Sequence, residues 1–209
     1  MENIMAGVEL FQKGGFIMYV LLLCSLFVVA TGIERWQYFR RMDAGRAFAG
    51  SFAELAGRAD WDGAMRLAKE AKGALPALLT EAAGRGHGVH TYLEIQSGLV
   101  LSRLRARLYY LSVIVTMAPL LGLLGTISGM ISAFSVFNVQ TSQASAITGG
   151  VGEALVATAF GLCVAILALV IHAYFTQRVD RILTDMEECC SPGVSKRLTI
   201  RRIPPDQIS

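Results

Sequence analysis

The sequence is short of charge, and the charge that it has is unevenly placed. Only 17% of its 209 residues are charged and 54% are hydrophobic, whereas a soluble domain carries about 25% charged residues. Three segments contain no Asp, Glu, Lys or Arg: residues 14–33, 108–152 and 154–177. Because a helix needs about 20 apolar residues to cross about 30 Å of hydrocarbon, this shortage excludes an ordinary soluble domain and predicts a membrane protein.

The lengths of the uncharged segments predict three crossings. Residues 14–33 and 154–177 each suit one helix, whereas the run 108–152 is too long for one and contains the polar stretch NVQTSQASAIT at 138–148. We therefore expect an all-α integral membrane protein with the following parts: N-terminal segment 1–13, transmembrane helices 14–36, 108–137 and 150–177, helical segment 37–107, loop 138–149, and C-terminal helix and tail 178–209.

The first uncharged segment has one alternative interpretation. Residues 28–30 read Val-Val-Ala and resemble the cleavage site of a signal peptide. A signal peptide begins with a basic segment, whereas residues 1–13 contain two Glu and a single Lys. We therefore expect a retained transmembrane helix.

Basic residues are missing from the loop 138–149. Twelve Lys and Arg lie in residues 34–107, six in 178–209 and one in 1–13. The positive-inside rule then places 34–107 and the C-terminus in the cytoplasm, and the N-terminus and the loop outside. In a bacterium this orientation corresponds to the inner membrane, with the N-terminus in the periplasm.

Neither disulfides nor an enzyme site are indicated. Cys24 and Cys163 fall inside predicted spans, and the adjacent Cys189 and Cys190 fall on the reducing side. The Gly-rich stretch GGVGEA at 149–154 lacks the Lys-Ser/Thr of a phosphate loop. Histidines 87 and 90 have no third ligand nearby. We expect no enzyme activity, no metal, no cofactor and no nucleic-acid partner.

Residues 34–107 are rich in Ala, Leu, Arg and Glu, which favours helices. Asp60 or Asp62 can cap a helix over WDGAMRLAKEAK that Gly73 and Pro76 end. A second helix is expected over PALLTEAAG, and a third from Tyr92 straight into the second span. ERWQYFRRMDAGRAF (34–48) is expected to extend the first span. After the third span, apolar residues repeat at helical spacing: Val179, Ile182, Leu183 and Met186.

Small residues form a stripe on each of the last two spans, because positions three and four apart share a helix face. Helices in lipid associate by close packing, which small residues permit. We therefore expect these helices to approach other helices nearly backbone to backbone. The stripe of the second span is Ala118, Gly122, Gly125, Gly129 and Ala133, and that of the third is Gly150, Ala154, Ala157, Gly161, Ala165 and Ala168.

A carboxylate near the middle of the membrane is also missing. The interior offers hydroxyls, among them Thr126 and Thr158, and Glu153 lies at the outer end of the third span. The hydroxyls can instead bond their own helix, and Glu153 can instead stabilise a helix start. Glu153 and Thr158 are about 140° apart around an ideal helix. A protein that moves protons needs a protonatable group, so we expect another chain to supply it.

Two segments resemble the MotA/TolQ/ExbB proton-channel family, specifically its three-span ExbB-like and TolQ-like branch. They are APLLGLLGTISGMISAF at 118–134 and EALVATAFGLCVAI at 153–166. The resemblance is strongest over about residues 105–178. It implies a homopentamer in which the second and third helices surround a central pore, occupied by the single transmembrane helices of two copies of an ExbD- or TolR-like partner that brings an Asp.

The resemblance also implies roles for individual residues. The family's pore-lining polar positions match Thr126, Thr158 and Glu153, and His172 is a candidate for the inner pore mouth. Leu167 stands where family members usually have Pro. Ion flow, of protons or sodium, would move the partner helices and drive work in the periplasm.

Two further interpretations remain. A passive membrane scaffold would explain the glycine stripes but not the polar residues as a set. A self-contained channel would conduct ions without a partner. Besides other copies of itself and the partner, the chain is expected to contact membrane lipids, for which its basic tail is suited.

Overall fold

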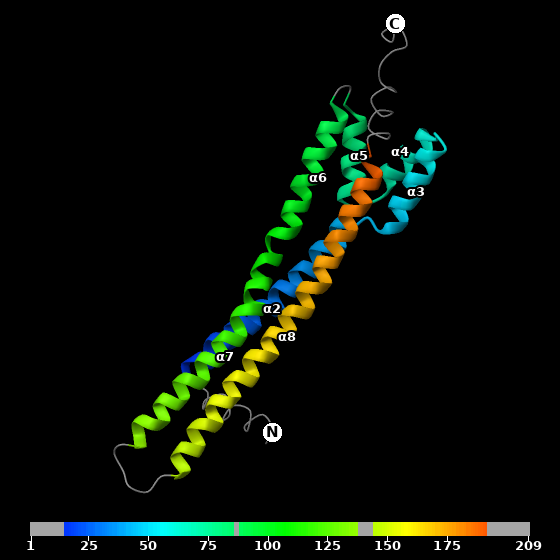
Figure 1. Ribbon diagram of the computed structural model, residues 1–209. Helices are drawn as coiled ribbons and strands as arrows, with labels where there is room; N and C mark the ends of the chain where they lie inside the picture. Colours follow the sequence, from blue (N-terminus) through cyan, green and yellow to red (C-terminus); the bar gives the residue numbers. More distant parts are fainter. Residues whose placement is uncertain (1–14, 86–87, 138–143, 192–209) are drawn as a thin grey trace, which may run out of the picture. The chain divides into compact units, whose positions relative to one another are not determined.

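The computed structural model describes residues 15–85, 88–137 and 144–191, and every regular element in them is an α-helix (Figure 1). The helices are α2 (Gly15–Met42), α3 (Arg46–Gly57), α4 (Trp61–Glu70), α5 (Ala74–Ala83), α6 (Val89–Ala106), α7 (Leu108–Phe137) and α8 (Ala144–Cys189). The N-terminal segment 1–13, His87, residues 138–143 and the tail from 192 lie outside the described residues.

The chain divides into two compact units. The first, here called the apolar unit, contains the start of α2 up to Ile33 together with Leu108–Tyr174. The second, the charged unit, contains Glu34–Arg107 and the chain from Phe175 onward. Helices α2 and α8 contribute to both units.

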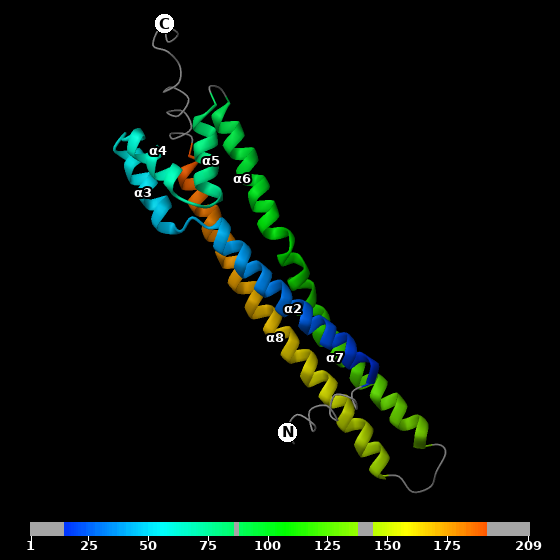
Figure 2. The same ribbon diagram turned by 180° about the vertical axis from the view of Figure 1, so that it is seen from behind.

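Three helices run alongside one another in the apolar unit (Figure 2). A Cβ atom built on Gly125 of α7 would lie 3.7 Å from Ile17 of α2, and one on Gly32 of α2 would lie 3.3 Å from Ile171 of α8. The buried face of α2 follows a helical repeat, with Met18, Leu21, Cys24, Val28 and Thr31.

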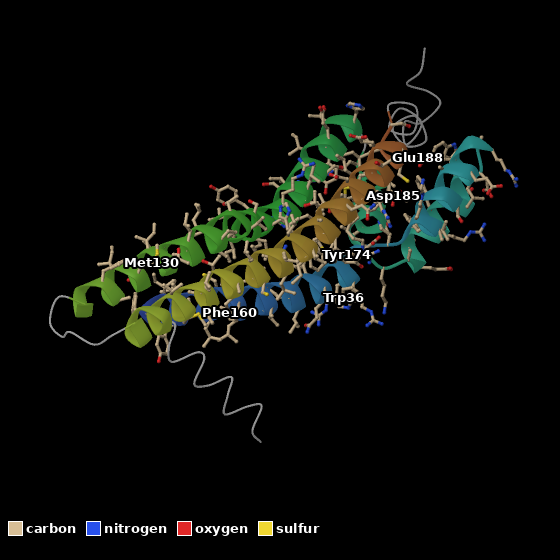
Figure 3. The ribbon with its side chains drawn as sticks, turned by 60° about the horizontal axis from the view of Figure 1, so that its bottom comes forward. Trp36, Met130, Phe160, Tyr174, Asp185 and Glu188 are labelled. Carbon is tan, nitrogen blue, oxygen red and sulfur yellow. The ribbon has the colours of Figure 1, made fainter. Side chains whose placement is uncertain are left out.

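The outward faces of these helices are apolar (Figure 3). Three stretches of the described chain are long and apolar enough to cross a bilayer, and only 28%, 28% and 33% of their most apolar windows is buried. Contiguous exposed apolar surface of this extent is rare on soluble proteins. An all-α integral membrane protein with three such helices fits these observations.

The charged unit has its own core. Helices α3 to α6 pack in chain order, and the stacked rings of Phe39 (α2) and Phe175 (α8) have centroids 5.2 Å apart. Three ion pairs also lie in this unit: Arg107 with Glu34 of α2, Arg105 of α6 with Asp180 of α8 (3.7 Å), and Arg178 of α8 with Asp43, the residue after α2 (3.4 Å).

The extension of the first span is shorter than its sequence predicts. Helix α2 ends at Met42, because the Asp43 carboxylate accepts a hydrogen bond from the Gly45 amide (2.8 Å) and Gly45 adopts φ 83°. An Asx turn of this kind competes with helix. The predicted extension of the first span is therefore confirmed as far as Met42 and wrong beyond it, and α3 is a separate helix that the sequence analysis missed.

Other helix ends also differ in detail. Asp60, not Asp62, caps α4, since its carboxylate accepts from the Gly63 amide at 3.0 Å. Pro76 lies in the first turn of α5 instead of ending α4, a position where its missing N–H costs nothing. Helix α6 ends at Ala106, and only Arg107 separates it from α7, which begins at Leu108. Helix α8 begins at Ala144, within the segment expected to be a loop, and continues unbroken to Cys189.

Gly73 generates a stability prediction. Its φ of 140° and ψ of 175° lie in a region that is essentially restricted to glycine, and an added Cβ would lie 2.9 Å from the backbone nitrogen of Ala44. We predict that Gly73→Ala destabilises the chain by about 1–3 kcal/mol. Gly50→Ala is the matched control, because that position lies inside α3 with open space around it and gains about 0.5–1 kcal/mol. Thermal unfolding in detergent, followed by circular dichroism, compares the two midpoints; an unchanged midpoint for Gly73→Ala would contradict the assignment.

Candidate functional site

Helices α7 and α8 touch at the level of their backbones. A Cβ atom on Gly161 would lie 2.7 Å from the Ala118 carbonyl oxygen and 3.1 Å from the Gly122 Cα. A Cβ on Gly122 would lie 3.0 Å from the Thr158 Cα. No side chain larger than hydrogen fits at either position without moving a helix, so these two glycines set the distance between α7 and α8.

The contact continues along both small-residue stripes. A Cβ on Gly125 would lie 2.7 Å from the Ala157 Cβ. Ala154, Ala157 and Ala165 are buried, and Gly129 is half-buried. The small residues of the two stripes therefore lie mainly in the contact between α7 and α8 of one chain. Gly150 is among the residues whose surroundings the structure does not describe.

Thr158 joins the two helices by a hydrogen bond. Its hydroxyl donates to the Gly122 carbonyl oxygen at 2.9 Å, in a partly buried position. In a regular helix the same carbonyl accepts from the backbone N–H of Thr126, and a carbonyl oxygen has two lone pairs. Bonds of this kind between membrane helices contribute about 0.6 kcal/mol on average, because the separated helices also find hydrogen-bond partners.

Thr126 uses its hydroxyl within its own helix. The hydroxyl donates to the Leu123 carbonyl at 2.7 Å, and the side chain is half-buried. Each of the two threonines therefore has its single O–H donor engaged with a backbone carbonyl. A hydroxyl has one donor and two acceptor lone pairs, so what remains free on each oxygen is acceptor capacity.

Glu153 and His172 also lie on α8. Glu153 is in the helix interior, more than two turns after Ala144, whereas the influence of the helix dipole on a carboxylate is confined to the first turn. Stabilisation of the helix start therefore does not account for Glu153, whose side chain lies outside the described part. His172 is half-buried, and Leu167 is exposed.

One residue was not singled out by the sequence analysis. Pro119 lies inside α7, one turn before Gly122. Proline removes a helix hydrogen bond and kinks the helix. Its presence inside a predicted span is the sequence signal by which Pro119 could have been found. Within the described residues no group of three His, Cys, Asp or Glu is arranged to hold a metal ion.

This chain is similar in sequence to known proteins. A family model described as the MotA/TolQ/ExbB proton channel family matches residues 67–188. The putative biopolymer transport protein ExbB-like 1 of Synechocystis sp. is 32% identical over 170 residues, which cover 77% of this chain and 67% of the relative. A putative ExbB homolog of Methanothermobacter thermautotrophicus is 26% identical over 185 residues, 86% of this chain and 66% of the relative. The Tol-Pal system protein TolQ of Pseudomonas aeruginosa is 33% identical over 82 residues, 39% of this chain and 36% of the relative.

The chain spans about two thirds of the length of the first two of these relatives. The three apolar helices and these similarities together define a multi-pass membrane protein. The chain belongs to the MotA/TolQ/ExbB family, as the family match and the Synechocystis relative establish.

The backbone contact between α7 and α8 generates a second prediction. Gly161→Ala places a methyl group 2.7 Å from the Ala118 carbonyl oxygen, so the helices must separate. We predict a loss of about 1–3 kcal/mol, the usual cost of overpacking. Gly152→Ala, on the same helix with open space around it, is the control and is expected to keep or raise stability. Thermal unfolding in detergent distinguishes the variants, and equal midpoints would mean that the contact does not limit packing.

Proposed function

We propose that this chain is the ring subunit of an ion-driven inner-membrane motor of the ExbB and TolQ type. The observation that carries the proposal is the pair of threonine hydroxyls, Thr126 and Thr158, whose donors are both engaged with carbonyls of α7. Oxygens left as acceptors suit a wall that receives a proton donor or a cation. Residues 15–33 and 108–174 contain one acidic residue, Glu153, which we expect near the outer end of its span.

The missing protonatable group then belongs to a partner. A single transmembrane helix bearing an Asp, as in ExbD- or TolR-like proteins, would donate a hydrogen bond from its protonated carboxyl to Thr126 or Thr158. Once ionised, the same carboxylate would meet acceptor oxygens and lose that interaction. One charge that crosses a potential of 100 mV releases about 2.3 kcal/mol, so a few ions suffice to move such a helix.

Five copies of the chain would surround two partner helices. In this arrangement the outward faces of α7 and α8 contact neighbouring copies, the partner or lipid, which explains why large apolar side chains such as Leu123, Ile127 and Ile166 are exposed in the single chain. Residues 34–107 and 178–209 would lie in the cytoplasm, with loop 138–149 and the N-terminus in the periplasm. His172 would lie near the inner pore mouth, and Glu153 near the outer one.

The relatives' names support a role in transport or in the envelope. They include biopolymer transport proteins and a Tol-Pal system protein. We propose that the motor powers work of this class, in the periplasm, and that the chain is not itself an enzyme. The passive scaffold remains the alternative function, because the α7–α8 contact would serve either role.

Thr158 provides the test that separates motor from scaffold. In liposomes that contain the chain and its single-span partner, Thr158→Val removes the hydroxyl oxygen and the bond to the Gly122 carbonyl. We expect ion flow to fall about tenfold, because a hydrogen bond between neutral groups contributes about 0.5–1.5 kcal/mol and about 1.4 kcal/mol corresponds to a factor of ten. Thr158→Ser retains the hydroxyl and should retain flow, and both variants should assemble. Full flow through an assembled Thr158→Val ring would favour the scaffold.

The assembly itself can be weighed. Native mass measurement of the purified complex is expected to give five copies of the chain with two of the partner. Liposomes that contain the chain alone should not conduct ions, because the protonatable group is missing. Conduction by the chain alone would support the self-contained channel and contradict the proposal that a partner supplies the protonatable carboxyl group.

A further inference from the structure

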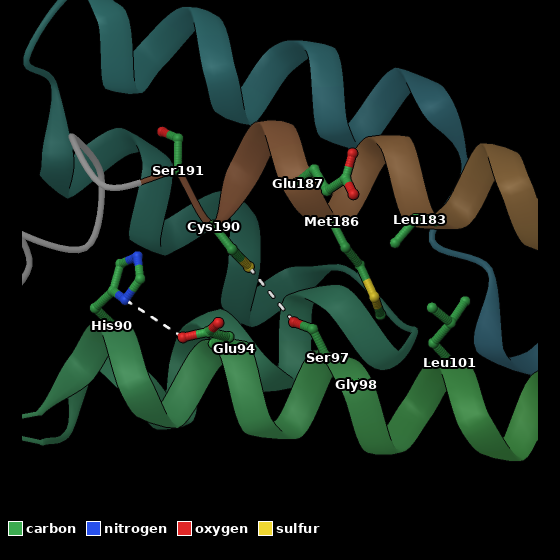
Figure 4. Close-up of a pocket in the computed structure, with 10 residues that line it drawn as sticks. All are labelled: His90, Glu94, Ser97, Gly98, Leu101, Leu183, Met186, Glu187, Cys190 and Ser191. Carbon is green, nitrogen blue, oxygen red and sulfur yellow. Dashed lines mark hydrogen bonds and ion pairs between the residues drawn. The ribbon is translucent and has the colours of Figure 1, made fainter.

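A pocket lies in the charged unit between α6 and the C-terminal end of α8 (Figure 4). Its volume is about 320 Å³. Its inner part is apolar, with Leu101 of α6 facing Leu183 and Met186 of α8. The remaining lining is polar or small: His90, Glu94, Ser97, Gly98, Glu187, Cys190 and Ser191. We call it the α6–α8 pocket.

The rim of the α6–α8 pocket is acidic. Glu94 and Glu187 line it, and neither Lys nor Arg is among its lining residues. His90 lies 3.8 Å from Glu94, on the same helix. Glu94 is 74% exposed, so its carboxylate is available to a further cationic group.

At Gly98 the wall of the α6–α8 pocket has no side chain. A Cβ atom built there would meet nothing within 4 Å. Glycine inside a helix costs about 0.5–1 kcal/mol relative to alanine, and here close packing within the described chain does not require it. Space beside Gly98 is therefore available to a bound segment.

The chain leaves this pocket at Ser191 with a sequence that complements it. Residues 192–209 read PGVSKRLTIRRIPPDQIS. Pro-Gly at 192–193 is a turn dipeptide. The apolar residues that follow alternate with basic ones: Val194, Leu198, Ile200 and Ile203 against Lys196, Arg197, Arg201 and Arg202.

We propose that residues 192–203 turn back at Pro192-Gly193 and bind in the α6–α8 pocket of the same chain. Leu198 and Ile200 cover the apolar inner part, and the basic residues pair with Glu94 and Glu187. The bound segment would tie α6 to the end of α8. This interaction is independent of the proposed motor function.

The lengths agree. His90 and Leu101 are eleven residues apart on α6, which corresponds to about 16 Å along the helix. An extended segment rises about 3.3 Å per residue, so Val194–Ile200 reaches about 20 Å. The segment that begins at Ser191 is thus long enough to follow the pocket from its polar to its apolar end.

Cys190 reports on the pocket. It is half-buried, its sulfur lies 4.0 Å from the Ser97 hydroxyl, and burial raises the pKa of its thiol while Ser97 lowers it. Its neighbour Cys189 is 0% exposed. Alkylation of Cys190 by iodoacetamide, located by fragment mass spectrometry in detergent, therefore measures access to the pocket.

The rate of Cys190 alkylation is compared in three forms of the protein: the unaltered chain, a shortened chain and a charge-reversed chain. We expect Cys190 to react at least about fivefold faster in a chain ending at Ser191, and in a chain with all four basic residues of 196–202 changed to Glu, than in the unaltered chain. A synthetic peptide of residues 192–209 should restore protection to the shortened chain. Equal alkylation rates in all forms would overturn the proposal. This is the result expected if residues 192–209 bind anionic lipid and not the α6–α8 pocket.

A cysteine pair tests whether the contact is within one chain. In a Cys190→Ser background, Gly98→Cys with Leu198→Cys should form a disulfide that changes the mobility of the monomer. Gly98→Cys with Ser209→Cys is the matched control and should link at least about fivefold less. Covalent dimers as the main product would assign the pocket to a neighbouring copy and overturn the proposal.

Discussion

The backbone contact between Gly122 of α7 and Gly161 of α8 is the constraint on which the apolar unit depends. Lipid gives helices no hydrophobic reason to associate, so their association requires close packing and hydrogen bonds between them. Both are available only because neither glycine has a Cβ: a Cβ built on Gly161 would lie 3.1 Å from the Gly122 Cα, and the Thr158 hydroxyl lies 2.9 Å from the Gly122 carbonyl oxygen. The same contact decides which faces of α7 and α8 remain for other partners.

The hydrogen bonds of the two hydroxyls determine their chemical character: that of Thr158 crosses the α7–α8 contact, and that of Thr126 lies within α7. A threonine exposed to water can donate or accept, whereas Thr126 and Thr158 each donate to a carbonyl and keep only acceptor capacity. In a medium of low dielectric this restriction matters, because an unpaired polar group there is costly. In the proposed motor, a protonated carboxyl would be stabilised beside such oxygens and an ionised one would not. Proton binding and the position of the partner helix would then be coupled through the wall.

The sequence predicts the parts of this structure that follow from periodicity and composition. The uncharged runs predict the three apolar helices, and the spacing of glycine and alanine predicts the small faces, including Ala118, Ala154 and Ala168, all of which are buried. The spacing of small residues does not determine which helix their face contacts. The hydrogen bond from the Thr158 hydroxyl to the Gly122 carbonyl could therefore not be predicted from the sequence. Helix α3 was missed because one hydrogen bond, which the Gly45 amide donates to the Asp43 carboxylate, ends α2 in a segment with helical composition.

The length of α8 explains how one helix serves two units. Its 46 residues correspond to about 69 Å, more than twice the thickness of the hydrocarbon, so a part of it must lie outside the bilayer. The 24 uncharged residues from 154 to 177 cover about 36 Å, which is sufficient for the crossing. The first charged residue after this run is Arg178, which forms an ion pair with Asp43. The stacked rings of Phe39 and Phe175 make a second contact in the charged unit. This half-buried ion pair, the aromatic contact and the buried apolar residues Val179 and Met186 together hold this end in the charged unit.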